Sequence, residues 1–383
     1  MGTIEEFLRG RQERGLLRKL KPASFRANGK IYFGTKQYFD FSSNDYLGLS
    51  GHPKLKKAAN TAIDKFGVAS CASRLLSGDA EIFHQLEEEV AKFKNKEAAL
   101  IFNSGYQANV GIISALFAKG DCIFSDRLNH ASIVDAVFLS GARLFRFRHN
   151  DPQHLELLLK KERNKFKNAL IITESIFSMD GDRAPLKELV ELKEKYNCQI
   201  MVDEAHATGV FGPNGSGAVE EEKLSPQVDL IMGTFSKALA GFGAYLAASK
   251  SIIDYLVNTS RSFIYSTALP PAVIACNLAS LELIKDEPDR RKILLSRAAI
   301  LRSRLGEKGF CVKGASQIIP VILGDNSRAL AFAAAFQKNG YWALAVRPPT
   351  VPRGEARLRL SLNYYHDEGT LNKLIDAISE IRI

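Results

Sequence analysis

Short apolar segments alternate with longer amphipathic segments between about residues 80 and 260, and this alternation restricts the fold more than any other feature of the chain. Each apolar segment is short and apolar at nearly every position, which is typical of a strand buried on both faces. The amphipathic segments between them, such as 81–93 and 186–196, have helical spacing. The predicted strands are Ala98–Phe102, Cys122–Ser125, Leu144–Phe147, Ala169–Thr173, Gln199–Asp203, Leu230–Met232 and Ala244–Ala248. The pattern predicts an α/β fold with a sheet covered by helices on both faces.

A chain of 383 residues is long enough for about two domains. We expect residues 46–270 to form a large domain and residues 310–383 to form a smaller α+β domain. A long helix over 271–309 would connect the two. Residues 1–45 are expected to form an arm and a short hairpin that pack with the small domain, with Asn28-Gly29 as the hairpin turn.

The net charge of +10 favours an anionic partner, such as a nucleic acid, a phosphorylated cofactor or an acidic protein. The basic excess is strongest between Arg9 and Lys21. Only two aromatic residues, Phe7 and Phe25, flank that segment, which makes a poor platform for stacking bases. We therefore expect no nucleic-acid partner.

The five cysteines are scattered and form no CxxC pair, which disfavours a disulfide framework and a zinc site and is typical of a reducing compartment. The N-terminal segment Met1-Gly2-Thr3-Ile4-Glu5-Glu6 has acidic residues where a signal peptide is basic and then apolar. The uncharged run 262–281 contains two prolines and several polar residues, so it predicts a turn and a buried helix rather than a membrane span. We expect a soluble, cytoplasmic protein with no bound metal and no membrane partner.

The segment Val202–His206 contains the letters DEAH, which also occur in the metal-binding box of some helicases. A helicase needs a phosphate-binding loop upstream, and this sequence has none. Asp203 stands instead at the carboxyl end of a predicted strand, where open α/β sheets bind ligands. Lys237 follows the next predicted strand and is the only charged residue between Asp229 and Lys250. An isolated lysine in apolar surroundings has a lowered pKa and becomes a nucleophilic amine.

A carboxylate and an amine at neighbouring strand ends suit an enzyme that uses pyridoxal phosphate (PLP). The carboxylate keeps the pyridine ring protonated as an electron sink, and the amine forms a Schiff base. Three more elements follow predicted strands. Gly105 opens a helix whose free amides suit a phosphate, His130 is placed to stack on a cofactor ring, and Ser178 lies in a polar loop. Each alone is more often structural, but the five together are specific.

These motifs resemble those of the α-oxoamine synthases, PLP enzymes of fold type I. The segments that carry the resemblance are Ser43–Leu49, Asn129–Ser132, Phe177–Gly181, Val202–His206 and Thr234–Lys237. The resemblance extends over nearly the whole chain. It implies a large domain with a mainly parallel seven-stranded sheet, a small α+β C-terminal domain and an N-terminal arm. Two departures are Glu204, where the family commonly has Asp, and Ser175, where Gly is common.

The resemblance also implies a role for each matching residue. Lys237 would carry the Schiff base and act as the base, His130 would stack on the PLP ring, and Asp203 would pair with the ring nitrogen. His206 and Ser178 would hydrogen-bond the phenolic oxygen. The cofactor, chiefly its phosphate, would be bound by Gly105, Tyr106, Thr234 and, from the neighbouring subunit of a homodimer, Ser266 and Thr267. Arg347 would hold the amino-acid carboxylate, and Arg18, Asn44 and Thr350 match positions that touch substrate.

Within the family, the segments Gly324–Ala329 and Val346–Pro352 resemble the branch that serves biotin synthesis. That branch implies a decarboxylative condensation of L-alanine with pimeloyl-CoA or pimeloyl-acyl carrier protein, which gives an amino-ketone, CO2 and the free thiol. Two alternatives remain open. One is the branch that acts on glycine and acetyl-CoA, and the other is a non-catalytic subunit of a heterodimer, which should lack the lysine that stands here at position 237.

Overall fold

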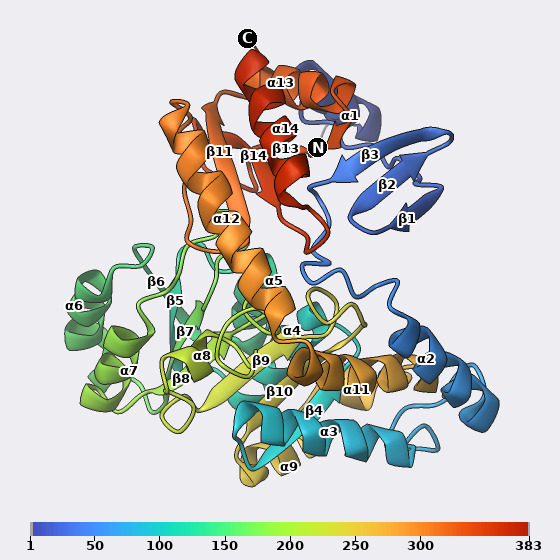
Figure 1. The fold of residues 1–383 in the computed structure, drawn as a ribbon. Helices are drawn as coiled ribbons and strands as arrows, with labels where there is room; N and C mark the ends of the chain where they lie inside the picture. The colour runs from blue at the N-terminus through green and yellow to red at the C-terminus, as the bar shows by residue number, and fades with distance from the viewer. Residues whose placement is uncertain (1–2, 382–383) are drawn as a thin grey trace. The chain divides into compact units, whose positions relative to one another are not determined.

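The computed structural model describes residues 3–381, so the first two and last two residues of the predicted arm and small domain lie outside the described part. The chain divides into two compact units (Figure 1). The larger unit comprises Leu47–Ser178 and Asp182–Lys292. The smaller unit comprises Met1–Tyr46, Met179–Gly181 and Ile293–Ile383. The larger unit therefore extends beyond the predicted limit of residue 270.

A seven-stranded sheet forms the centre of the larger unit, with strand order β4-β10-β9-β8-β7-β5-β6. Strand β10 is antiparallel to both of its neighbours, and the other pairings are parallel. This confirms the predicted α/β class and the mainly parallel sheet. The strands are β4 (Ala98–Phe102), β5 (Cys122–Asp126), β6 (Arg143–Phe147), β7 (Ala169–Glu174), β8 (Gln199–Asp203), β9 (Leu230–Thr234) and β10 (Ala244–Ala248).

Helices flank this sheet, and several begin at the caps that their sequences predict. The Asp151 side chain accepts a hydrogen bond from the amide of His154, with Pro152 at the first helical position of α6. The helices that lie wholly in the larger unit are α2 (Pro53–Phe66), α3 (Glu81–Lys94), α4 (Gly105–Leu116), α5 (Ala131–Ser140), α6 (Pro152–Glu162), η1 (Arg163–Lys165), α7 (Leu186–Lys195), α8 (Ala218–Glu221), α9 (Lys250–Thr259), α10 (Arg261–Ile264) and α11 (Pro271–Asp286).

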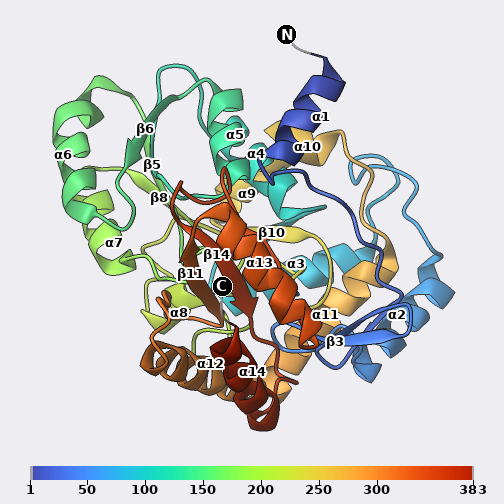
Figure 2. The ribbon, with the colours of Figure 1, turned by 90° about the horizontal axis from the view of Figure 1, so that it is seen from above.

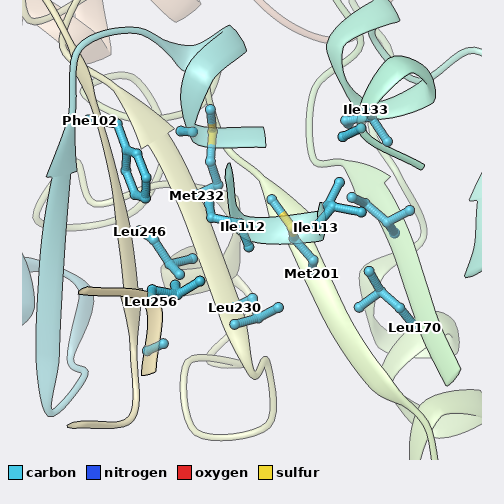
Figure 3. Close-up of a cluster of buried hydrophobic side chains, with 14 of the residues drawn as sticks. Phe102, Ile112, Ile113, Ile133, Leu170, Met201, Leu230, Met232, Leu246 and Leu256 are labelled. Carbon is cyan, nitrogen blue, oxygen red and sulfur yellow. The ribbon is translucent and has the colours of Figure 1, made fainter. Parts of the chain in front are cut away.

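The core of this unit lies between one face of the sheet and the helices α4, α5 and α9 (Figure 3). Ile112 and Ile113 from α4 pack onto Met201 and Leu230 of the sheet. Helices α4 and α5 pack side by side (Figure 2). Strand residues with the opposite orientation, such as Ile171, are equally buried, so both faces of the sheet are covered. Burying one such aliphatic side chain stabilises the fold by about 1.5–3 kcal/mol.

The predicted single helix over 271–309 is instead two helices, α11 and α12 (Asp289–Glu307). Pro288 lies between them, and a proline inside a helix removes a backbone donor and clashes with the preceding turn. Helix α11 packs against α2 and α3 and belongs to the larger unit. A turn connects α10 to the first residues of α11. No helix among residues 3–381 has the length and apolar character that a bilayer crossing requires.

The smaller unit joins the two ends of the chain. Strand β12 pairs in parallel with β3, so that Trp342 lies opposite Asp40. Asn28 and Gly29 both have positive φ, which makes the predicted two-residue turn between β1 and β2. A second sheet has the order β11-β14-β13. The elements are α1 (Ile4–Glu13), β1 (Phe25–Ala27), β2 (Lys30–Phe33), β3 (Lys36–Asp40), β11 (Ile318–Gly324), α13 (Asn326–Lys338), β12 (Tyr341–Trp342), β13 (Ala345–Val346), β14 (Ala356–Ser361) and α14 (Glu368–Glu380).

Arg357 explains why three residues from the middle of the chain belong to this smaller unit. Its guanidinium, fully buried in β14, donates to the Oδ1 atom of Asp180 at 2.7 Å and to the carbonyl of Met179 at 3.2 Å. A buried guanidinium needs such partners because an unpaired buried charge is costly. All five cysteines are free thiols, and no cluster of potential metal ligands occurs within residues 3–381.

Candidate active site

The carboxyl ends of strands β4, β5, β7, β8 and β9 lie at one edge of the sheet in the larger unit. Strand β10 is antiparallel to both β4 and β9, so β4 runs in the same direction as the parallel strands. Open α/β sheets bind ligands at this edge. The predicted residues that end or follow these strands are Gly105, Tyr106, His130, Ser178, Asp203, His206, Thr234 and Lys237.

Lys237 lies in the turn after β9, half-buried, and its Nζ atom is 2.9 Å from the Nε2 atom of His206. His206 lies in the turn after β8 and is buried. At this distance the amine and the imidazole form a hydrogen bond. The structure therefore joins the predicted nucleophile to a predicted cofactor ligand. Ser178 is half-buried in the turn after β7.

Asp203 ends β8 and is only 4% exposed. Its Oδ2 atom accepts a hydrogen bond from Nδ2 of Asn109 at 3.1 Å, and its Oδ1 atom accepts one from the amide of Ala205 at 2.9 Å. No ion pair involves this carboxylate within residues 3–381. A buried carboxylate without a cation needs a partner that carries a proton, such as a pyridinium nitrogen.

His130 is connected to Asp203 through two side chains. Its Nδ1 atom is 2.8 Å from the hydroxyl of Ser132, and that hydroxyl accepts from Nδ2 of Asn109 at 2.9 Å, the same amide group that binds Asp203. Burial lowers the pKa of His130, so its ring is neutral at pH 7. The chain of contacts holds the two predicted cofactor residues in a fixed relation.

Glu174 is a further buried acid at this edge. It ends β7 and lies opposite Asp203 in the parallel register. Its Oε1 atom accepts a hydrogen bond from the amide of His130 at 2.6 Å. Burial, together with the charge of Asp203, raises the pKa of Glu174 to about 8. The carboxyl group is therefore mostly protonated at neutral pH, and it anchors the backbone of His130.

The first turn of α4 presents the predicted anion site. Ser104 caps the helix by accepting from the amide of Gln107 at 3.2 Å. Gly105 and Tyr106 form the first turn, where unpaired amides and the helix dipole favour an anion. The Tyr106 hydroxyl is hydrogen-bonded to Asp135, which raises the pKa of the phenol.

Ser266 and Thr267 lie beside this same turn of their own chain. The Ser266 hydroxyl accepts from Nε2 of Gln107 at 3.4 Å, and the Thr267 carbonyl accepts from Nδ2 of Asn103 at 2.7 Å. Their predicted contact with the cofactor of a neighbouring subunit stays a prediction. Thr234 ends β9, and its hydroxyl donates to the carbonyl of Gly243 at 2.8 Å.

The four predicted substrate residues all belong to the smaller unit. Arg18 donates to the hydroxyl of Thr350 at 3.3 Å. Arg347 is half-buried, and its pKa is lowered by burial and by the charges of Arg18 and Arg11. These residues form a cationic group suited to an anionic substrate.

Asn44 has a different partner, which the sequence reasoning did not name. Its Oδ1 atom accepts from both terminal nitrogens of Arg359 at 3.3 Å and from the hydroxyl of Tyr46 at 3.1 Å. Arg359 lies on β14 and is 9% exposed. The sequence signal for Arg359 is its position between two leucines of an apolar strand, where a charged residue needs a specific partner.

Asn109 and Glu174 were also missed, although the sequence carries a signal for each. Asn109 is a polar residue in the otherwise apolar helix 108–113, and buried polar residues need a specific partner. Glu174 ends an apolar strand, so the same rule that selected Asp203 applies to it. Together, the amine, the buried carboxylate and the helix terminus fit a phosphorylated cofactor with a protonated ring nitrogen.

The family model described as aminotransferase class I and II matches residues 36–378. The chain belongs to this family. The 8-amino-7-oxononanoate synthase of Geobacter sulfurreducens (strain ATCC 51573 / DSM 12127 / PCA) is 46% identical over 374 residues, which cover 97% of this chain and 95% of that protein.

Two solved structures are similar to this chain in fold and in sequence. A serine palmitoyltransferase variant from S. paucimobilis, with a bound PLP–myriocin aldimine, has a TM-score of 0.91 and 28% identity, and the match covers 98% of this chain and 96% of that chain. The 8-amino-7-oxononanoate synthase of Francisella tularensis has a TM-score of 0.78 and 31% identity, with 90% of this chain and 97% of that chain covered.

Proposed function

We propose that this chain is a PLP-dependent acyltransferase that condenses L-alanine with pimeloyl-CoA or pimeloyl-acyl carrier protein to give 8-amino-7-oxononanoate, a step of biotin biosynthesis. The observation that carries the proposal is the Lys237–His206 contact of 2.9 Å beside the buried Asp203 carboxylate. It occurs in a chain 46% identical to a synthase of that name over 374 residues.

When bound, PLP supplies the electron sink that makes the Cα proton of an amino acid acidic. Lys237 would hold the cofactor covalently, and its amine would then remove the proton from Cα of alanine. His206, which is hydrogen-bonded to that amine, would orient it toward the substrate. Asp203 would hold the proton on the ring nitrogen, and His130 would stack on the ring.

The remaining roles follow from position. The first turn of α4, with Gly105 and Tyr106, would bind the phosphate together with Thr234, and Ser266 and Thr267 would serve the phosphate of a neighbouring subunit. Ser178 would hydrogen-bond the phenolic oxygen together with His206. In the balanced reaction, alanine loses its Cα proton and its carboxylate as CO2, Cα bonds to the thioester carbonyl carbon, the thiol leaves, and a proton returns to Cα.

Two arginines of the smaller unit are candidates for the alanine carboxylate. Arg347 belongs to a group of cations with Arg18 and Arg11, which suits a longer or multiply charged anion. Arg359 is held by Asn44, which suits one fixed carboxylate. Separate Arg347→Gln and Arg359→Gln variants distinguish them, because loss of the carboxylate anchor raises KM for L-alanine and loss of an acyl-donor contact raises KM for the thioester.

We further propose a cytoplasmic homodimer. Leu76 is 81% exposed and Tyr265 is 72% exposed, and the bridge between Ser73 and Thr267 lies close to both in the sequence. An apolar surface of this kind is one that a second copy would cover. Sedimentation of a single species of twice the chain mass supports the homodimer, and a monomer at assay concentration contradicts it.

Turnover with paired substrates tests the proposed reaction. The PLP-loaded protein is incubated with L-alanine and pimeloyl-CoA, and separately with glycine and acetyl-CoA, and the products are identified by mass spectrometry. We expect 8-amino-7-oxononanoate from the first pair and at most a trace of product from the second. Preferential turnover of glycine and acetyl-CoA would assign the chain to the other branch, and no turnover with any donor would refute the proposal.

A further inference from the structure

The loop after β7 carries Ser178, and the tip of this loop belongs to the smaller unit although both of its sides belong to the larger one. The larger unit ends at Ser178 and resumes at Asp182, so the tip comprises only residues 179–181. Ser178 is therefore the last residue before the chain enters the smaller unit. The position of its hydroxyl depends on what holds the tip.

Arg357 of β14 holds the tip with hydrogen bonds from its guanidinium. One terminal nitrogen donates to Oδ1 of Asp180 at 2.7 Å and to the carbonyl of Met179 at 3.2 Å. The other two nitrogens donate to Glu355, one to the carbonyl at 2.9 Å and one to Oε2 at 2.6 Å. Because the side chain of Arg357 is fully buried, the loss of a partner would leave a buried charge without its hydrogen bond, which is costly.

Backbone contacts fix the tip further. The amide of Ala315 donates to the carbonyl of Gly181 at 2.9 Å. Gly181 has a φ of +65°, and a Cβ atom there would lie 2.3 Å from the carbonyl oxygen of Ile318 on β11. A Cβ atom at Gly314 would likewise lie 2.6 Å from the carbonyl oxygen of Asp180. The backbone of the tip thus packs directly on the backbone of the smaller unit, at distances that only glycine allows.

The two sides of the loop are held by the larger unit. The amide of Phe177 donates to the carbonyl of Asp182 at 3.1 Å, and Oδ2 of Asp182 is 2.7 Å from Nε2 of His149. Ser178 is the single residue between Phe177, which these contacts hold, and Met179, which Arg357 holds. A change in the hold on Met179 therefore reaches the hydroxyl of Ser178 through one residue of backbone.

The strand that holds the loop also carries a candidate for the substrate carboxylate. Arg359 is two residues from Arg357 on β14, and side chains at this spacing lie on the same face of a sheet. Arg357 also pairs with Val346 of β13, which directly precedes Arg347, the other candidate. One small sheet therefore connects both candidate arginines with the loop of Ser178.

We propose that Arg357 is a positioning residue, which fixes the Ser178 hydroxyl relative to the sheet that binds the substrate carboxylate. The inference rests on the proposed function, in which Ser178 hydrogen-bonds the phenolic oxygen of PLP and an arginine on or next to that sheet binds the carboxylate of alanine. Arg357 acts on the hydroxyl through Asp180 and Met179, the two tip residues that it binds.

The pH dependence of the absorption of bound PLP tests this role without turnover. A hydroxyl that donates to the phenolic oxygen stabilises the deprotonated form of the bound cofactor, so it lowers the pH midpoint of the absorption change. Ser178→Ala should raise this midpoint by about 0.5 units or more. Arg357→Gln should also raise it. The double variant should show no higher midpoint than Ser178→Ala alone, because both changes remove the same hydrogen bond.

Two further variants separate positioning from a loss of stability. Lys313→Met removes an exposed cation that faces the same two carboxylates, 3.9 Å from Asp180 and 3.1 Å from Glu355, and it should leave the midpoint unchanged. Asp180→Asn keeps an oxygen for Arg357 but removes the charge. It should raise the midpoint less than Arg357→Gln does, and it replaces that variant if loss of the buried guanidinium prevents folding.

Three results would overturn the inference. One is a wild-type midpoint in folded Arg357→Gln, or in Asp180→Asn where Arg357→Gln does not fold, even if the melting temperature falls. The others are additive shifts in the double variant and a shift in Lys313→Met as large as that in Arg357→Gln. Failure of the wild type to bind PLP, or an unchanged midpoint in Ser178→Ala, would instead count against the proposed function and would remove the inference with it.

Discussion

His149 is expected to make the stability of the larger unit depend on pH. Its Nδ1 atom is 2.9 Å from Oδ1 of Asp126 at the end of β5, and its Nε2 atom is 2.7 Å from Oδ2 of Asp182. The ring also packs edge-on against Phe177, with centroids 4.4 Å apart. One imidazole thus ties the loop after β7, which carries Ser178, to the end of β5.

The size of the effect follows from the pKa. Burial would lower the pKa of His149, but the hydrogen bonds and charges of Asp126 and Asp182 outweigh burial and raise it to about 9. A rise from 6.5 to about 9 corresponds to about 3 kcal/mol of folding free energy. Because the folded-state pKa is the higher one, this stabilisation is complete below pH 6.5 and is lost as the pH rises through about 9.

Urea unfolding of the wild type and of His149→Gln at about pH 6 and about pH 9.5 measures the effect. The substitution should lower the free energy of unfolding at both pH values. The decrease at the lower pH should exceed the decrease at the higher pH by about 3 kcal/mol. Glu174, whose pKa is raised to about 8, also titrates in this range, but it does so in both proteins and cancels in the difference. Asp182→Asn removes one of the two carboxylates that contact His149. Its pH-dependent loss of free energy of unfolding should be smaller than that of His149→Gln. An equal loss of free energy of unfolding for His149→Gln at both pH values would show that His149 does not titrate as stated.

Three further substitutions test the packing and the site. Lys94→Met breaks the fully buried pair with Glu204, whose Nζ–Oε2 distance is 2.7 Å, and should cost about 3–5 kcal/mol of stability, seen as a lower melting temperature; if adding Glu204→Gln restores none of it, the buried charge is not the cause. Asn109→Leu removes the donor to Asp203 and should lower kcat about tenfold or more with little change in KM, since a hydrogen bond to a charged group contributes about 1.5–3 kcal/mol; an unchanged kcat would contradict this. Ile113→Ala removes a fully buried side chain of the core and should cost about 2–5 kcal/mol in urea unfolding, and a cost below about 1 kcal/mol would contradict the packing.

The fold class and the edge that carries the site could be predicted from the sequence because both depend on local patterns. Strand β8, for example, has three consecutive apolar residues, 200–202, before Asp203, and its observed bounds match the predicted ones. Parallel strands bring their carboxyl ends together, so residues that follow separate strands were expected to meet. The Lys237–His206 contact is such a meeting of residues from two loops.

The rest of the site depends on contacts between residues far apart in the chain. A chain of hydrogen bonds runs from His130 through Ser132 and Asn109 to Asp203. It depends on the relative orientation of α4 and α5, which the sequence of neither helix specifies alone. Likewise, the pairing of β3 with β12 joins residues that are 302 positions apart, such as Phe39 and Tyr341, and only the structure shows it. The break between α11 and α12 has a local cause, Pro288, which is visible in the sequence. The helical pattern on both sides of this proline led to the prediction of one continuous helix.

The proposed reaction requires Lys237 to hold PLP through its amine. Borohydride reduction of the PLP-loaded protein, followed by mapping of the modified peptide by mass spectrometry, tests this role. Lys250→Met is a control, because Lys250 is an exposed lysine that follows β10 at the opposite edge of the sheet. We predict one modified site, at Lys237, in the wild type and in Lys250→Met, and none in Lys237→Ala. A modification on another lysine, or its persistence in Lys237→Ala, would contradict the account.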